Sequence, residues 1–148
     1  MDKAKAITDK IVYATLATVN DAGQPWNSPV WSFHDEDYTY YWCSWKESQH
    51  SRNIRANGKV FIVIYDSTAP EGTGEGVYIQ AQAEEVNDLV QIETILAKRS
   101  EFKDGKRNAV EFKGEYPRRW YVAKAEQIWL NDEGEMNGHY IDVRRQVL

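Results

Sequence analysis

The stretch Tyr40–Asn57 reads YYWCSWKESQHSRNIRAN and contains the boundary between two kinds of structure. Its first residues are aromatic and typical of a β-strand, whereas serine, glutamine, histidine and arginine follow from Ser48 onward. Ser48 is a suitable helix N-cap, and Asn57-Gly58 is a suitable stop of the left-handed type. The sequence therefore predicts an aromatic strand followed directly by a short polar helix.

Strand patterns lie on both sides of this stretch. Residues 14–19, 26–34 and 38–44 are separated by turn formers at 20–25 and 35–37, which predicts three sequential antiparallel strands, a meander. Residues 59–65 are β-branched and aromatic and are expected to form a strand buried on both faces. Further strands are expected at 76–86, 120–129 and 139–143, with a turn at 131–134 between the last two.

Helical patterns occur at two other places. Apolar residues recur at helical spacing over 2–13, and Asn87-Asp88 precedes an apolar stripe of Leu89, Ile92, Ile95 and Leu96. Residues 101–118 are charged and are expected to form a loop with one helical turn. Because closing a sheet removes its exposed edges, we expect one mainly β (α+β) domain over residues 1–148: a six- to seven-stranded antiparallel β-barrel with flanking helices.

Composition limits the classes of function. A chain of 148 residues with 42% hydrophobic and 28% charged residues is typical of a soluble globular domain. A formal charge of −5 argues against nucleic acid as a partner, so any basic site must be local. Cys43 is the only cysteine, which excludes an intramolecular disulfide and suits a cytoplasmic location. The three histidines lack metal-site spacing, and no apolar run approaches the ~20 residues that a membrane span requires.

The start of the polar helix allows two interpretations. A helix N-terminus favours anions, and Ser48 and His50 lie there, with Arg52 and Arg55 in the following turns. These side chains would then bind a phosphate. Alternatively, Ser48 only caps the helix, and the arginines pair with Glu47 or other acids on the surface.

The order of three segments resembles the pyridoxamine 5′-phosphate oxidase-like flavoproteins, which have an FMN-binding split barrel. These segments are ATLATVNDAGQPWNSPVW (Ala14–Trp31), YYWCSWKESQHSRNIRANGKV (Tyr40–Val60) and GVYIQAQAEEV (Gly76–Val86). The resemblance implies a homodimer with FMN in a groove at the subunit interface. It also implies a flavin-dependent oxidoreductase that transfers hydride to or from a small-molecule substrate.

The resemblance also assigns residues to the cofactor. The strand along the flavin ring corresponds to Asn27, Ser28, Pro29, Val30 and Trp31, and the phosphate-binding corner corresponds to Cys43, Ser44, Trp45, Ser48, Gln49, His50 and Arg52. Trp129 is expected either to close over the flavin of the partner subunit or to lie in the core.

The segment 26–33 has neither the arginine nor the lysine that true pyridoxamine phosphate oxidases carry there, so the substrate is expected to differ from vitamin B6 phosphate. The alternatives are a non-catalytic, stress-related flavin-binding protein and a relative that uses a deazaflavin (F420) or haem. No residue is assigned as a catalytic acid or base.

Overall fold

The computed structural model describes residues 2–148, which form three α-helices, one 3-10 helix and seven strands. None of these helices is long and apolar enough to cross a membrane. In chain order the elements are α1 (Asp2–Lys10), β1 (Tyr13–Val19), β2 (Pro25–His34), β3 (Thr39–Trp45), α2 (Gln49–Ala56), β4 (Lys59–Tyr65), β5 (Gly76–Val86), α3 (Leu89–Arg99), η1 (Ala109–Phe112), β6 (Arg118–Met136) and β7 (His139–Gln146).

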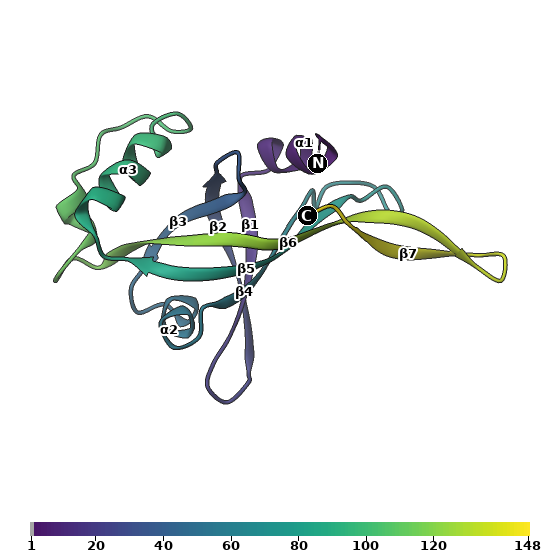
Figure 1. Cartoon of the computed structure of the whole chain (residues 1–148), viewed down its shortest axis with the longest axis horizontal. Coiled ribbons are helices and arrows are strands. Elements are labelled where there is room, and N and C mark those ends of the chain that lie inside the picture. Colours follow the sequence, from purple (N-terminus) through teal and green to yellow (C-terminus); the bar gives the residue numbers. More distant parts are fainter. Residues whose placement is uncertain (1) are drawn as a thin grey trace.

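The strands form an antiparallel barrel. Their order is β3-β2-β1-β4-β5-β6-β7, and an additional pairing between β3 and β6 closes the first six into a ring. Strand β7 pairs with β6 alone, and the β6–β7 hairpin extends away from the barrel (Figure 1). The predicted barrel and the predicted meander of β1, β2 and β3 are confirmed.

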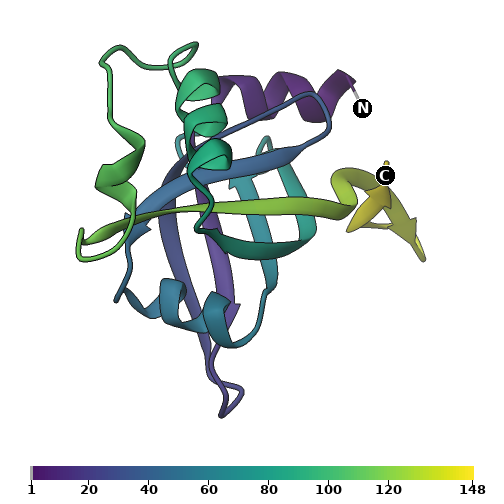
Figure 2. The same cartoon turned by 60° about the vertical axis from the view of Figure 1, so that its left-hand side comes forward.

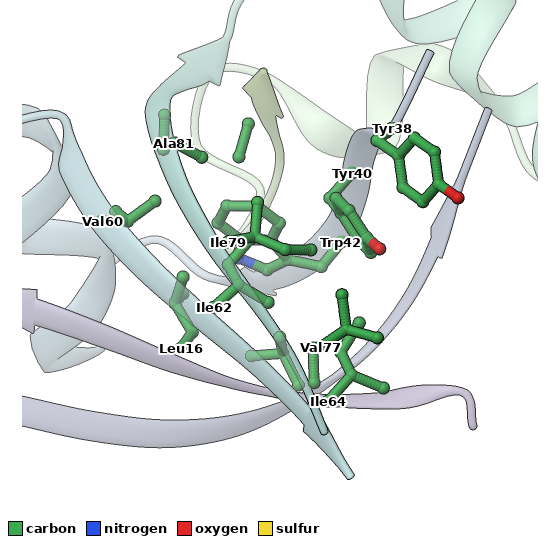
Figure 3. Close-up of a cluster of buried hydrophobic side chains, with 14 of the residues drawn as sticks. Leu16, Tyr38, Tyr40, Trp42, Val60, Ile62, Ile64, Val77, Ile79 and Ala81 are labelled. Atoms are coloured by element: carbon green, nitrogen blue, oxygen red, sulfur yellow. The ribbon is translucent and has the colours of Figure 1, made fainter. Parts of the chain in front are cut away.

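The interior of the barrel is filled by one side of each strand. Leu16, Ile62, Ile79 and Trp42 are almost completely buried there and point toward one another (Figure 3). The expectation that residues 59–65 are buried on both faces is wrong, because burial alternates along β4. Phe61 is 37% exposed, since a strand of a single-layer barrel has only one face toward the core.

A second apolar cluster lies on the outside of the barrel. It joins Phe33, Tyr41 and Trp120 on the strands to Ile92 and Ile95 of α3 and to residues of η1. Helix α3 and the segment after it therefore cover one outer face (Figure 2). Asp88 caps α3 as predicted, accepting a hydrogen bond from the Gln91 backbone N–H at 2.9 Å. The predicted apolar stripe is only partly buried, since Leu89 is 39% exposed.

Two helix ends differ from the predictions. Helix α1 ends at Lys10 and not near residue 13. Helix α2 does not end in a left-handed conformation, because Asn57 is extended with φ −149°. Gly58 is required for another reason: a Cβ there would lie 2.2 Å from Gln82 Nε2 and 2.5 Å from the Ala83 carbonyl oxygen, so only glycine allows this approach to β5.

The predicted position of the turn between the last two strands is also wrong. Residues 131–134 belong to β6 and pair with residues 141–144 of β7. The chain reverses at Asn137-Gly138, where both residues have positive φ, 52° and 79°. This Asn-Gly pair is a strong hairpin signal.

A partly buried charged cluster ties α2 to the barrel. The Glu85 carboxylate of β5 lies 3.0 Å from Arg55 Nη1 and accepts a hydrogen bond from the Tyr121 hydroxyl at 3.0 Å. Arg119 Nε is 3.9 Å from the same carboxylate, and its guanidinium also donates to the carbonyls of Tyr116, Arg118 and Gly114. These contacts fix the position of the helix that follows β3.

Candidate functional site

The first half of β2 has an open edge. It pairs with β1 throughout Pro25–Trp31, but its pairing with β3 covers only Ser32–His34. Among the described residues no strand pairs with the second edge of 25–31, so the barrel is split there. Backbone groups on such an edge are free to hydrogen-bond a ligand. The predicted ring-binding residues Asn27–Trp31 form this edge, with Val30 facing the core and Trp31 on the outside.

Hydroxyl groups gather where β3 ends and α2 begins. His50 Nε2 lies 2.8 Å from Ser44 Oγ and 3.2 Å from Ser48 Oγ, and Ser48 in turn donates to Ser51 Oγ at 2.8 Å. Ser51 donates onward to the Trp45 carbonyl at 2.9 Å. The structure therefore brings together three of the predicted phosphate-binding side chains. We call Ser44, Ser48 and His50 the hydroxyl corner.

Burial decides the charge state of this corner. His50 is 9% exposed, and desolvation lowers the pKa of its imidazole below the ordinary 6.5. The ring is therefore neutral at pH 7 and acts through a hydrogen bond and not through charge. Backbone N–H groups of the first turn of α2 supply the remaining favourable interaction for an anion, although the Ser51 N–H already donates to the capping Ser48 Oγ at 3.4 Å.

The two arginines of α2 have different partners. Arg55 forms the ion pairs with Glu85 and Glu47, as the surface interpretation expected. Arg52 is exposed and donates to the uncharged Gln49 side chain at 2.9 Å. Its positive charge has no carboxylate partner within 4.0 Å among the described side chains. Of the two, Arg52 alone is available to an anion at the N-terminus of α2.

A cavity of about 510 Å³ lies next to the split, between the outer face of the barrel and the segment that follows α3. Trp31 and Cys43, both predicted as cofactor contacts, line it together. The sequence analysis missed its other walls. These are the aromatic residues Tyr13, Phe112 and Trp120, the cations Arg99, Lys103, Lys106, Arg107 and Arg118, and the residues Asp104 and Gly105.

Cys43 faces this cavity in a basic environment. Burial raises the pKa of its thiol, while Arg118, Arg107 and Arg99 act in the opposite direction. The net shift is upward, so the group is a neutral thiol at pH 7. The sequence showed no basic partner for Cys43, because Arg118 becomes its neighbour only through the pairing of β3 with β6.

Within one chain, Trp129 lies far from the hydroxyl corner. Trp45 pairs with Arg118, and Trp129 lies eleven residues farther along β6, about 36 Å at ~3.3 Å per residue. Its ring stacks against Phe61, with centroids 6.2 Å apart, on the exposed face of the barrel. Trp129 therefore lies on the outer face that Phe61 shares with β1, far from the hydroxyl corner of the same chain.

The sequence did contain a signal for the missed cavity residues, namely a cluster of positively charged side chains. The segment Arg99–Arg107 reads RSEFKDGKR, and most of it lies in the range 101–118 that is expected to form a charged loop with one helical turn. A basic cluster in a chain of net charge −5 is the local basic site that the composition allowed. Its placement against Trp31 depends on tertiary structure.

These observations describe a split antiparallel barrel with a polar corner beside the split. The model of the family described as pyridoxamine 5′-phosphate oxidase matches residues 1–132. The chain belongs to this family. A search among curated proteins found no match.

Solved structures share the fold. A Listeria innocua protein classed with pyridoxamine 5′-phosphate oxidase is 22% identical, with a TM-score of 0.65 over 86% of this chain and 94% of that one. A structure named F420 reductase is 19% identical, with a TM-score of 0.60 over 84% and 94%. A haem-binding protein from Mycobacterium smegmatis is 18% identical, with a TM-score of 0.67 over 95% of this chain and 56% of that one.

Proposed function

We propose that the protein is an FMN-binding oxidoreductase that transfers hydride between the flavin and a small-molecule substrate. The open edge of β2 beside the hydroxyl corner carries this proposal, because it offers unpaired backbone groups for a planar ring and an anion-binding helix start for a phosphate. Membership in the pyridoxamine 5′-phosphate oxidase family supports it.

Different residues would bind the phosphate and the ring of FMN. The hydroxyls of Ser44 and Ser48, the neutral His50 and the first N–H groups of α2 would hold the phosphate, with Arg52 as the available cation. The backbone of Asn27–Trp31 would orient the ring. FMN, when bound, supplies the hydride chemistry, and the protein positions it and tunes its potential.

A second copy of the chain would complete the site. Phe61 and Tyr65 are 37% and 48% exposed on the outer face of the barrel, where Phe61 stacks with Trp129. Exposed aromatic residues on one face favour a protein interface. We propose a homodimer in which this face is covered and Trp129 of each subunit approaches the flavin of the other.

A relative that uses a deazaflavin or haem is the second candidate. The solved structures that share the fold favour it, since one is named F420 reductase and another is a haem-binding protein. A flavin-binding protein without catalytic activity, related to stress responses, is the alternative from another class.

Titration of the purified protein with FMN, riboflavin, F420 and haem tests the proposal. We expect FMN to bind at least about a hundredfold more tightly than riboflavin, because riboflavin lacks the phosphate and so loses about two charge-assisted bonds of ~1.5–3 kcal/mol each. Reduction of the bound flavin by NADH or NADPH with a defined acceptor separates an enzyme from a carrier. Tight binding of F420 or haem with no binding of FMN would reject the proposal.

A further inference from the structure

A buried amide lies in the middle of helix α2. Asn53 is 3% exposed, although asparagine favours caps and turns over helix interiors and an unpaired buried amide would destabilise the fold. Both polar atoms of its side chain have side-chain partners. Asn53 Nδ2 donates to Thr18 Oγ1 on β1 at 2.9 Å, and Asn53 Oδ1 accepts from Gln49 Nε2 at 2.8 Å. Asn53 therefore joins the start of α2 to the barrel.

The same hydrogen-bonded chain continues at both ends. Gln49 Oε1 accepts from Arg52 Nη2 at 2.9 Å, and the Thr18 hydroxyl donates to the Trp26 carbonyl at 3.4 Å. Trp26 belongs to the half of β2 that has the open edge. We call Arg52, Gln49, Asn53 and Thr18 the amide chain. It runs from the exposed guanidinium on α2 to the strand that carries the open edge.

Arg52 fixes the direction of the amide chain. A guanidinium can only donate, so Gln49 must turn its oxygen to Arg52 and its NH₂ group to Asn53. Asn53 in turn presents its own NH₂ group to Thr18, whose O–H remains available to donate onward. Rotating the Gln49 amide by half a turn would set its NH₂ group against the guanidinium. Each side chain therefore holds the next in one orientation, and such chains reinforce their own hydrogen bonds.

Gln49 restrains a side chain that is otherwise exposed. Arg52 has no carboxylate partner within 4.0 Å among the described side chains, and a free arginine loses rotamer freedom when it binds an anion. Long helical side chains point toward the N-terminus of their helix, which is where the hydroxyl corner lies. The hydrogen bond to Gln49 therefore orders the guanidinium at this end of α2 before any anion arrives.

We propose that Asn53 is a positioning residue for the phosphate of the cofactor. It acts through Gln49, which holds Arg52 in the orientation that binds the phosphate. This assignment rests on the proposed function, in which Arg52 is the available cation. Thr18 anchors the amide chain to the barrel. Two buried residues thus contribute to the discrimination between flavins with and without a phosphate.

Fluorescence titrations of the full-length protein with FMN and riboflavin test the proposal. Asn53→Leu removes both side-chain hydrogen bonds and keeps a branched side chain. Gln49→Leu, at a half-buried position, breaks the same chain and replaces Asn53→Leu in every comparison if that variant does not fold. Thr15→Val is the matched control, because it removes a β1 hydroxyl that donates to the Val63 carbonyl at 2.9 Å, outside the amide chain. Each variant is also made in the Arg52→Ala background.

We expect Asn53→Leu to weaken FMN binding by about threefold to tenfold, which corresponds to ordering one long side chain on binding. Riboflavin binding should change by less than about twofold, since riboflavin has no phosphate for the guanidinium to bind. In the Arg52→Ala background, Asn53→Leu should cost no further FMN affinity, because no guanidinium remains to be positioned. Thr15→Val should leave the ratio of the two affinities unchanged.

A second readout needs no flavin. NMR relaxation of the Arg52 side chain in the flavin-free protein should show greater mobility in Asn53→Leu than in the parent protein, and Thr15→Val should not change it. A side chain that only stabilised the fold would not produce this difference. Unchanged Arg52 mobility in Asn53→Leu would overturn the proposal even where FMN binds.

The titrations can also overturn it. Equal weakening of FMN and riboflavin in Asn53→Leu would assign Asn53 to the stability of the fold, and a selective loss that persists in the Arg52→Ala background would exclude an action through Arg52. An FMN preference that stays intact in Asn53→Leu would reject the positioning role alone. A parent protein that binds both flavins equally would instead reject the phosphate site of the proposed function.

Discussion

Replacing Glu85 by Gln should destabilise the protein through the cluster that joins α2 to β5 and β6. The carboxylate side chain is 14% exposed, and it faces Arg55 at 3.0 Å and Arg119 at 3.9 Å. Breaking a fully buried ion pair costs ~3–5 kcal/mol. Arg55 is 36% exposed and Arg119 keeps its carbonyl acceptors, so we expect a smaller loss, about 2 kcal/mol.

Urea denaturation at pH 7 measures this loss, and a thermal melt should show a decrease of about 4–8 °C for a domain of this size. Glu84→Gln is the matched control, because Glu84 is the exposed neighbour on the same strand. Its loss should stay below about 0.5 kcal/mol. Equal losses in the two variants would show that the cluster does not stabilise the fold and would refute the reasoning.

Four further predictions concern the site, the assembly and pH. Arg52→Ala should narrow the difference between FMN and riboflavin affinity, and equal weakening of both ligands in fluorescence titrations would assign Arg52 to helix stability alone. Trp129→Ala should weaken flavin binding while circular dichroism shows an intact fold, and an unchanged affinity would remove this residue from the site. Light scattering should give about twice 17.2 kDa, and a monomer with bound flavin at micromolar concentration would contradict the dimer. Burial raises the pKa of Asp35, but hydrogen bonds from Lys98, Thr39 and Tyr41 outweigh burial and lower the pKa to about 2 from 3.8. The ionised Asp35 carboxylate therefore stabilises the fold above about pH 4, and this stabilisation is lost as the pH falls toward 2. In acid unfolding, the Asp35→Asn variant should therefore lose less stability than the parent protein between about pH 4 and pH 2.

Local patterns predicted much of the fold. Alternation and turn residues located β1 to β5, and the caps at Ser48 and Asp88 located the starts of α2 and α3. The errors arose where a local pattern has two structural explanations. Asn131–Gly134 is rich in turn formers yet pairs within a long hairpin. The apolar run of β4 looked buried on both faces, although one of its faces is open in the single chain.

The site was predictable only where its residues are close in sequence. Ser44, Ser48 and His50 form one hydrogen-bonded group because the end of a strand leads directly into a helix N-terminus. The basic cavity depends on a contact between Lys103 and Trp31, which are far apart in the chain. No periodicity encodes such a contact, so the cations could be recognised as a cluster but not assigned to a place.

The long strand β6 has a consequence for how the protein is made. It supplies the closing partner of β3, where Thr39 pairs with Lys124, and it is also the neighbour of β5. A nascent chain that has not yet reached Arg118 therefore carries two unpaired strand edges at once. Because contacts so distant in sequence form slowly, the ring closes only after most of the chain has left the ribosome. Until then, these edges are the surfaces most exposed to aggregation or in need of a chaperone.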